Sequence, residues 1–251
     1  MSGRALDLVR DSELAAHLVS LERLSEDRGR RASGLPALDQ LLGGGWPRAA
    51  LSEISGRRSS GRTTVVRAAL TAAIAAGETV ALVDAGGSLD ARAFAWMDPG
   101  SARRSPSRED PGTLPGFPNS VSGPPLLWIR CAPVQALKAA DLVVAAGGFG
   151  MVALDLCDAM LRIPDAAWVR LRHAARAQGS TVLIAGGARR LGSFAAAAID
   201  LVGAPTFDAG GPPLFTGLHV DVRAPRLRAL HQPAENENGQ PCASLVFTSR
   251  S

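Results

Sequence analysis

The sequence contains no tyrosine, a single lysine and few aromatic residues. Aromatic side chains make up 4% of the 251 residues. So few rings give little support to a platform on which single-stranded bases could stack. Arginine supplies every basic position except Lys138, a skew that GC-rich codons would produce without selection on function. The net charge of +4 therefore permits an acidic or nucleic-acid partner without requiring one.

Long apolar runs are also missing. No stretch approaches the roughly 20 apolar residues that cross a bilayer, which excludes a membrane-spanning protein and a membrane partner. The N-terminus mixes charged residues with apolar ones and lacks the apolar stretch of a secretory signal. We therefore expect a cytoplasmic protein. Its length is sufficient for one large α/β domain with its own core.

Cysteine and histidine are too scattered to predict a metal site. Cys131, Cys157 and Cys242 form no C-x-x-C pair, so neither a disulfide framework nor a zinc site is indicated, and we interpret all three as core residues. The histidines show no H-E-x-x-H spacing, and no nucleophile elbow is present. Zinc protease and serine hydrolase chemistry therefore have no support.

Residues 1–31 are expected to form an N-terminal helix and a linker ahead of a core at 32–251. Leu14, Leu18 and Leu21 share one helical face, which either contacts a partner or packs on the chain's own core. The basic stretch 28–31 is interpreted as a solvated linker in preference to a DNA-binding patch.

From residue 33 the sequence alternates short apolar runs with alanine-rich helical stretches, a pattern typical of a parallel sheet covered on both faces. Strands are predicted at 49–55, 79–84, 150–156, 181–186 and within 194–202, and helices at 63–76, 134–146 and 165–178. Residues 218–222 and 244–248 are expected to be edge or antiparallel strands. Residues 99–125 are rich in Pro, Gly, Ser and charge, and we expect a disordered insertion there.

A glycine-rich loop lies between the first predicted strand and helix. Residues 56–63, GRRSSGRT, fit the phosphate-binding pattern G-x-x-x-x-G-K-[ST] at every required position except the lysine, which is Arg62. In such loops backbone N–H groups and the helix N-terminus hold phosphates, and the Ser/Thr hydroxyl holds magnesium. A wide guanidinium does not replace a compact ammonium, so we expect hydrolysis to be impaired. Alternatively, the loop survives only as a strand-to-helix connector.

Several collinear segments resemble the RecA recombinase family. The segments 33–39 (SGLPALD) and 43–48 (GGGWPR) resemble its entry to the core, 83–90 (VDAGGSLD) resembles its I-D-A-E-H-A-L-D segment, and 152–155 (VALD) resembles its Walker B run. The likeness spans residues 33 to about 186. It implies an α/β fold with a RecA-like P-loop core, a central, mostly parallel sheet and flanking helices.

The departures from that family concern catalysis. Its catalytic glutamate corresponds to Gly86 here, which cannot orient a water molecule. We therefore predict no catalytic residues and a vestigial nucleotide site; its members are Gly56, Ser60, Gly61, Arg62, Thr63, Thr64 and Asp155. No cofactor or resident metal is expected beyond weak binding of ATP and magnesium, for which Thr63 and Asp155 are suited.

The resemblance also implies DNA-contacting loops after the third and fourth strands. The first has little room before the helix at 165. Arg189 and Arg190 are the basic residues where the second would start, so they are candidate DNA contacts. The alternative interpretation is that these two arginines serve only to keep a surface loop soluble.

A shortened core with altered catalytic positions resembles the ImuA group of RecA-like accessory proteins. That resemblance implies a non-catalytic adaptor in the SOS DNA-damage response and translesion mutagenesis. Its implied partners are an ImuB-like Y-family polymerase homologue, an alternative replicative polymerase subunit and RecA, alongside self-association. Two alternatives stay open: a recombinase-like ATPase that uses Asp84 or Asp90 in place of the glutamate, and a SulA-like cell-division inhibitor.

Overall fold

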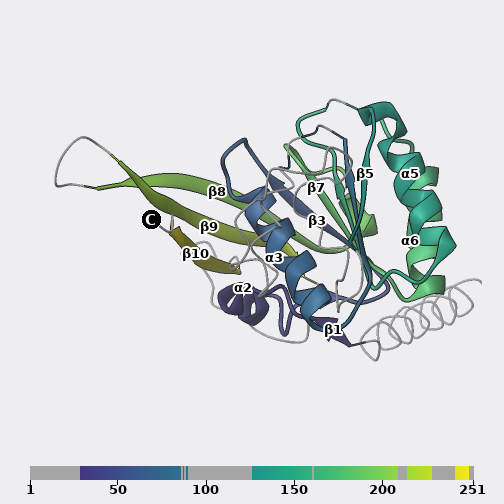
Figure 1. Cartoon of the computed structure of the whole chain (residues 1–251), viewed down its shortest axis with the longest axis horizontal. Helices are drawn as coiled ribbons and strands as arrows, with labels where there is room; N and C mark the ends of the chain where they lie inside the picture. The colour runs from purple at the N-terminus through teal and green to yellow at the C-terminus, as the bar shows by residue number, and fades with distance from the viewer. Residues whose placement is uncertain are drawn as a thin grey trace, which may run out of the picture.

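The computed structural model describes residues 29–85, 87, 89, 126–159, 161–208, 214–227 and 241–248. They form an α/β structure in which helices cover both faces of one large sheet (Figure 1). The elements are β1 (Arg30–Arg31), α2 (Pro36–Leu41), β2 (Trp46–Pro47), β3 (Leu51–Gly56), α3 (Arg62–Ala75), β4 (Val80–Asp84), β5 (Leu126–Arg130), α5 (Pro133–Ala146), β6 (Met151–Asp155), α6 (Asp165–Gln178), β7 (Thr181–Gly186), a 3-10 turn (Gly192–Phe194), β8 (Ala195–Phe207), β9 (Phe215–Leu227) and β10 (Cys242–Thr248).

The main sheet has the strand order β10-β9-β8-β3-β7-β6-β4-β5. Strands β8, β3, β7, β6, β4 and β5 are mutually parallel. Strand β9 pairs antiparallel with β8 on one side and with β10 on the other. The predicted fold class, a mostly parallel sheet flanked by helices, is therefore confirmed. The two C-terminal segments expected to be antiparallel are also confirmed, although both strands are longer than predicted. Beyond the end of β10, β8 and β9 continue as a projecting two-stranded arm (Figure 1).

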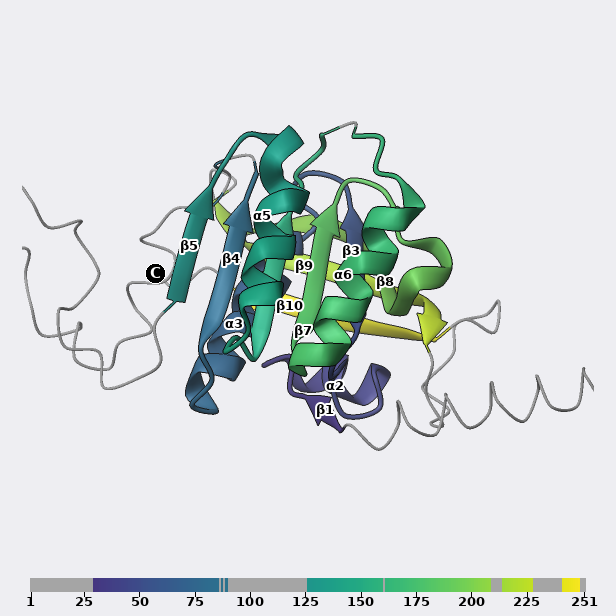
Figure 2. The same ribbon diagram turned by 90° about the vertical axis from the view of Figure 1, so that its right-hand side faces the viewer.

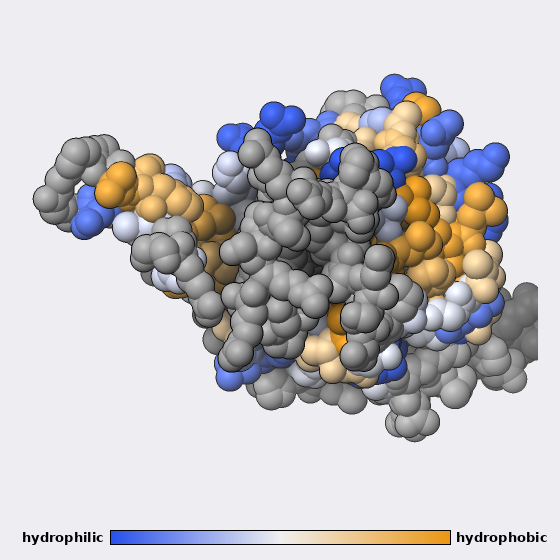
Figure 3. Space-filling view, viewed as in Figure 1, coloured by the Kyte–Doolittle hydropathy of each residue, from blue (hydrophilic) through white to orange (hydrophobic). Residues whose placement is uncertain are grey.

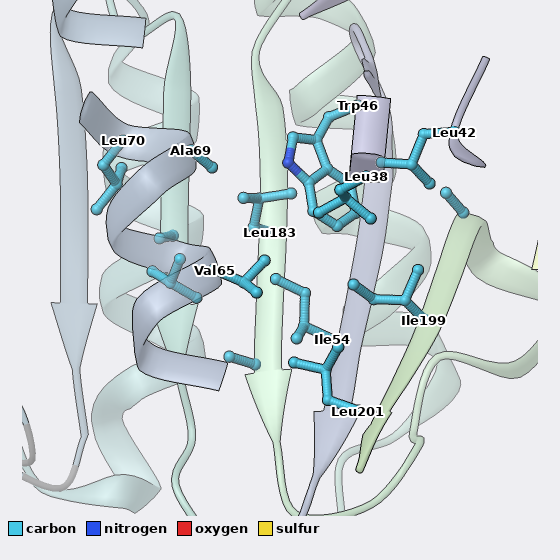
Figure 4. Close-up of a cluster of buried hydrophobic side chains, with 14 of the residues drawn as sticks. Leu38, Leu42, Trp46, Ile54, Val65, Ala69, Leu70, Leu183, Ile199 and Leu201 are labelled. Atoms are coloured by element: carbon cyan, nitrogen blue, oxygen red, sulfur yellow. The ribbon is translucent and has the colours of Figure 1, made fainter. Parts of the chain in front are cut away.

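Two apolar layers hold the sheet between its helices. Helices α5 and α6 cover one face, and α2 and α3 cover the other (Figure 2). On the second face Val65 and Leu70 of α3 approach Ile54 and Leu183 of the sheet, beside Trp46 (Figure 4). Strands β4, β6 and β7 are buried along their whole length. Their nearly continuous apolar sequences follow from this covering on both faces.

The fold corrects two sequence interpretations and contains two elements, β5 and α2, that the sequence analysis did not predict. The solvated linker is wrong at its end, because Arg30 and Arg31 form β1 against β2 and the Arg31 side chain is only 4% exposed. The three cysteines are free thiols and only partly buried, so they are not fully buried core residues, although Cys131 packs against the apolar layer of α5 and α6. Strand β5 was not predicted, although its sequence LLWIR is apolar, because it directly follows the proline-rich segment. The short helix α2 was not predicted either.

Buried Arg31 is held by an ion-pair cluster at the amino-terminal edge of the parallel strands. Its Nε lies 2.6 Å from Glu78 Oε2, its Nη2 donates to Glu78 Oε1 at 2.7 Å, and its Nη1 donates to the Gly150 carbonyl. Arg48 Nη2 also lies 3.1 Å from Glu78 Oε1. Burial lowers the pKa of the Arg31 guanidinium despite Glu78. This cluster joins β1 to the α3–β4 turn.

The N-terminal leucines Leu14, Leu18 and Leu21, the insertion at 99–125 and Gly86 lie outside the described residues. In the part of the chain that the structure describes, no helix is both long enough and apolar enough to cross a membrane.

Candidate functional site

The glycine-rich loop connects β3 to α3, as the motif predicts, and its two glycines are fixed by packing. A Cβ on Gly56 would collide with Ser60 Oγ and lie 2.7 Å from the Leu201 carbonyl oxygen. Gly61 precedes α3 with a φ of +90°, and a Cβ there would lie 2.9 Å from Val220 Cγ2. Geometry alone therefore requires both glycines, whether or not the loop holds a phosphate.

The Arg62 side chain, which replaces the lysine of the motif, crosses to the segment after β6. Its Nη2 donates to Asp158 Oδ1 at 3.0 Å and its Nη1 donates to the Cys157 carbonyl at 3.2 Å. The side chain is 12% exposed. Arg58 Nε also donates to Asp158 Oδ2 at 3.1 Å, but its side chain is 88% exposed, so that pair contributes little. Arg62 thus ties the loop to the end of β6.

Asp155 closes β6 beside Asp84, its register partner at the end of β4. Both carboxylates are buried, and Asp155 Oδ1 accepts the Cys157 N–H at 2.8 Å. The ligand atoms of Asp84, Asp155 and Cys157 lie within 4.8 Å of one another. The two carboxylates fit a hard cation such as magnesium, whereas the thiol does not. Thr63 is exposed at the first turn of α3, and Thr64 is half-buried.

A cavity of about 540 Å³ lies on the β8 side of the loop. Its lining includes three arginines and one carboxylate; they are Arg57, Arg58, Arg189 and Asp200. Ser60 also lines it, and the buried Ser60 Oγ has no hydrogen-bond partner among the described residues. Arg62, Thr63 and Asp155 are not in the lining. Arg62 therefore does not face this cationic cavity, but Arg58, which lines it, shares the Asp158 carboxylate with Arg62.

The two candidate DNA contacts occupy different environments. Arg189 is about half exposed, and its Nε lies 3.4 Å from Asp200 Oδ1 at the cavity. Arg190 instead donates from its guanidinium to the carbonyls of Ala159 and Leu161, the latter at 2.8 Å. Its side chain is thus engaged in holding the segment before α6. DNA contact by either residue stays a prediction.

The buried Glu53 carboxylate accepts hydrogen bonds from the backbone of the segment that follows β7. The backbone N–H groups of Arg190 and Leu191 donate to Glu53 Oε1, the latter at 3.1 Å. The side chain is 2% exposed, and burial raises its pKa more than these two bonds lower it. Nothing in the sequence pattern identified this residue as buried, because β3 (LSEISG) also contains Ser52 and Ser55 and is not a continuous apolar run.

One further polar row was not predicted. On the outward face of β9 and β10, Ser244 Oγ lies 2.7 Å from His219 Nε2, and His219 Nδ1 lies 3.8 Å from Asp221 Oδ1. The order of groups resembles a catalytic triad. However, 3.8 Å exceeds a hydrogen bond, and the Asp221 side chain is 60% exposed. The carboxylate therefore does not orient the ring as catalysis requires.

Comparison with known proteins supports the resemblance seen in the motifs. Residues 17–97 match the RecA N-terminal domain, a range that contains the glycine-rich loop and position 86. The chain is 32% identical over 124 residues to protein RecA of Francisella tularensis subsp. novicida (strain U112), and equally to RecA of subsp. tularensis (strain SCHU S4) and subsp. holarctica (strain LVS).

The aligned stretch is 49% of this chain and 29% of each of these relatives. The chain therefore covers less than a third of the length of the RecA proteins that it matches. The fold, the position of the loop and these similarities together support a RecA-like relative.

Proposed function

We propose that this chain is a non-catalytic RecA-like accessory protein of the ImuA type in the SOS DNA-damage response. It acts through protein contacts and supports translesion mutagenesis. Its partners in this proposal are an ImuB-like Y-family polymerase homologue, an alternative replicative polymerase subunit, or RecA. The observation that carries the non-catalytic part is the engagement of Arg62 by Asp158 and the Cys157 carbonyl.

A phosphate-binding loop needs a cation that is free to meet the phosphates. Here the guanidinium in that position is largely shielded from solvent and already satisfies a carboxylate and a carbonyl. Moving the guanidinium toward a nucleotide would first break both contacts, at a cost of about 1 kcal/mol for the partly exposed Asp158 pair. With Gly86 in the position of the recombinase glutamate, a base is missing as well.

One observation favours a second candidate function, a recombinase-like ATPase. The arginine-lined cavity beside the loop and the unpartnered Ser60 hydroxyl suit an anion. Asp84 and Asp155 would hold magnesium, which supplies charge neutralisation at phosphates when bound. With Asp84 engaged as a magnesium ligand, Asp90 would replace the missing glutamate as the base; Asp90 lies outside the described residues.

Calorimetric titration with ATP and magnesium, together with phosphate release in the presence of single-stranded DNA, separates the two functions. The accessory proposal expects no turnover above background and weak or undetectable binding. Arg62→Lys is expected to raise ATP affinity, because it restores a slender cation and releases Asp158. Turnover that disappears in Thr63→Ala would refute the non-catalytic proposal.

Affinity capture from DNA-damaged cells tests the partners. The bait is the full chain, compared with a variant in which Leu14, Leu18 and Leu21 are serine. Recovery of a Y-family homologue, a polymerase subunit or RecA supports the accessory function, and its loss in the variant assigns the contact to these leucines. Recovery of the cell-division ring protein alone would replace the mutagenesis role with division inhibition.

A further inference from the structure

Strand β10 (Cys242–Thr248) is the outermost strand of the sheet next to the projecting arm. In the described part of the chain it pairs only with β9, in an unbroken register from Cys242 opposite Arg223 to Thr248 opposite Gly217. Its other edge therefore carries backbone groups that no described strand uses.

The register identifies these groups. The Ala224 N–H donates to the Pro241 carbonyl at 2.8 Å, so this pair directs its backbone groups between β9 and β10. Backbone direction alternates along a strand, and the register has no bulge. The odd-numbered residues of β10 thus bond to β9. The N–H and C=O groups at the free edge belong to Cys242, Ser244, Val246 and Thr248.

This edge lacks the features that usually prevent strand addition. Natural edge strands carry lysine, proline, bulges or inward charges. The sequence of β10, CASLVFT, has no charged residue and no proline, and its pairing with β9 is regular. The opposite edge strand, β5, is shorter and ends in the charged Arg130, whose side chain is 59% exposed.

The edge is also complementary to itself. If two copies of β10 run antiparallel about a two-fold axis at Leu245, then Ser244 faces Val246 and Cys242 faces Thr248 of the other copy. Every outward N–H and C=O then meets a partner, because these are the residues whose backbone groups point outward. Small Ala243 also lies opposite large Phe247, and no like charges meet.

The same register keeps the two faces of the sheet continuous. Ala243, Leu245 and Phe247 pack toward the apolar layer of α2 and α3. Val246 lies on the outward face, where its side chain is 66% exposed. Inward residues then meet inward residues across the axis, because side-chain direction alternates with period two.

We propose that two copies of this chain associate by antiparallel β10–β10 pairing, forming one continuous sheet across a two-fold axis. The occupant of the free edge is a second copy because the strand satisfies itself in one full-length register without charge repulsion. The pairing uses only backbone groups at the outer edge of β10, and no residue of the glycine-rich loop donates or accepts in it.

Sedimentation equilibrium and light scattering of the purified full-length chain, from about 1 to 100 µM, test the proposal. The expected mass is twice the chain mass of 25.9 kDa. Val246→Pro removes an outward N–H without removing a bond to β9, and it is expected to weaken dimerisation at least about tenfold. Val246→Lys places like charges near the axis and is expected to act in the same direction.

Two controls make the result specific. Val134→Lys changes the same residue type at a 79% exposed position on α5 and should leave the dimer intact. Phe215→Ser removes an exposed ring from the arm, which carries an apolar patch on the face seen in Figure 3, and should also leave the dimer intact. Circular dichroism checks that each variant folds; if Val246→Pro does not, Val246→Lys decides.

A wild-type monomer at 100 µM would overturn the proposal. The outer edge of β10 would then be expected to pair with a strand from another protein. A dimer that survives both Val246 variants, or one that Phe215→Ser dissociates, would also overturn it. ATP binding or turnover would leave the proposal unaffected, so its failure is distinguishable from failure of the accessory function.

Discussion

Asp158 Oδ1 accepts a hydrogen bond from Arg62 Nη2 at 3.0 Å, and this contact joins the glycine-rich loop to the segment after β6. In the accessory proposal the contact keeps the guanidinium away from any phosphate. Its removal should therefore change anion binding more than it changes stability.

Asp158→Asn is expected to raise the affinity for ATP and for inorganic phosphate several-fold, because Arg62 loses its charged partner. The free energy of unfolding should fall by no more than about 1 kcal/mol, since Asp158 is partly exposed. Calorimetric titration and urea unfolding measure the two quantities. Asp141→Asn, which breaks the exposed 2.7 Å pair with Arg170, is the matched control. Equal anion affinity in both variants would contradict the prediction.

Glu78→Ala is expected to destabilise the protein by about 3 kcal/mol, because it leaves the buried Arg31 cation without its carboxylate. Arg48→Ala removes only the 41% exposed partner of the same carboxylate and should change the free energy of unfolding by less than about 1 kcal/mol. Urea unfolding of both variants provides the comparison. Similar losses would show that burial of Arg31 does not govern the energetics of the cluster.

Glu53→Gln should make the difference in stability from wild type depend on pH. Burial raises the folded-state pKa of Glu53 above its ordinary value, so the folded protein binds this proton more tightly than the unfolded chain. Wild type therefore gains stability relative to the variant as pH falls through the raised pKa. The gain is complete below the ordinary pKa and is lost as pH rises again. Thermal unfolding of both proteins between about pH 4 and 8 follows this difference, and a constant difference would contradict it.

Gly61→Ala should cost about 1–3 kcal/mol, because it combines a left-handed φ with a close approach to Val220. Gly77→Ala is the control: its φ is +82°, but no atom lies within 4 Å of the added Cβ. The control should lose only the backbone contribution, about 1 kcal/mol. Denaturant midpoints at equal slope report both values, and a larger loss at Gly77 would contradict the packing argument.

Arg189 and Arg190 should separate in function. Arg190→Ala is expected to lower stability by about 1–3 kcal/mol, because two backbone carbonyls lose their donor. Arg189→Ala should leave stability nearly unchanged. If Arg189 contacts DNA phosphates, the variant will bind single-stranded DNA more weakly and with a shallower salt dependence. Fluorescence anisotropy across salt concentrations measures this, and unaltered binding would remove Arg189 from the candidate contacts.

Local sequence patterns predicted most of the parallel core. Residues 165–178 and 181–186 form a helix and a strand at the expected positions, because alanine-rich helical periodicity and a short β-branched apolar run are strong local signals. Strand β5 was not predicted, because its apolar run is short and directly follows the proline-rich segment. The burial of Arg31 was not predicted, because it depends on an ion pair with Glu78, which is 47 positions away in the sequence.

The sequence by itself determined the α/β class and the position of the glycine-rich loop, since both depend on residue types within a few positions of one another. It also determined which residue replaces the lysine. Only the tertiary structure decided what Arg62 contacts, which edge of the sheet is left open, and that Arg189 and Arg190 point to different partners. These depend on strand order and register, which join residues about a hundred positions apart, and no local spacing specifies them.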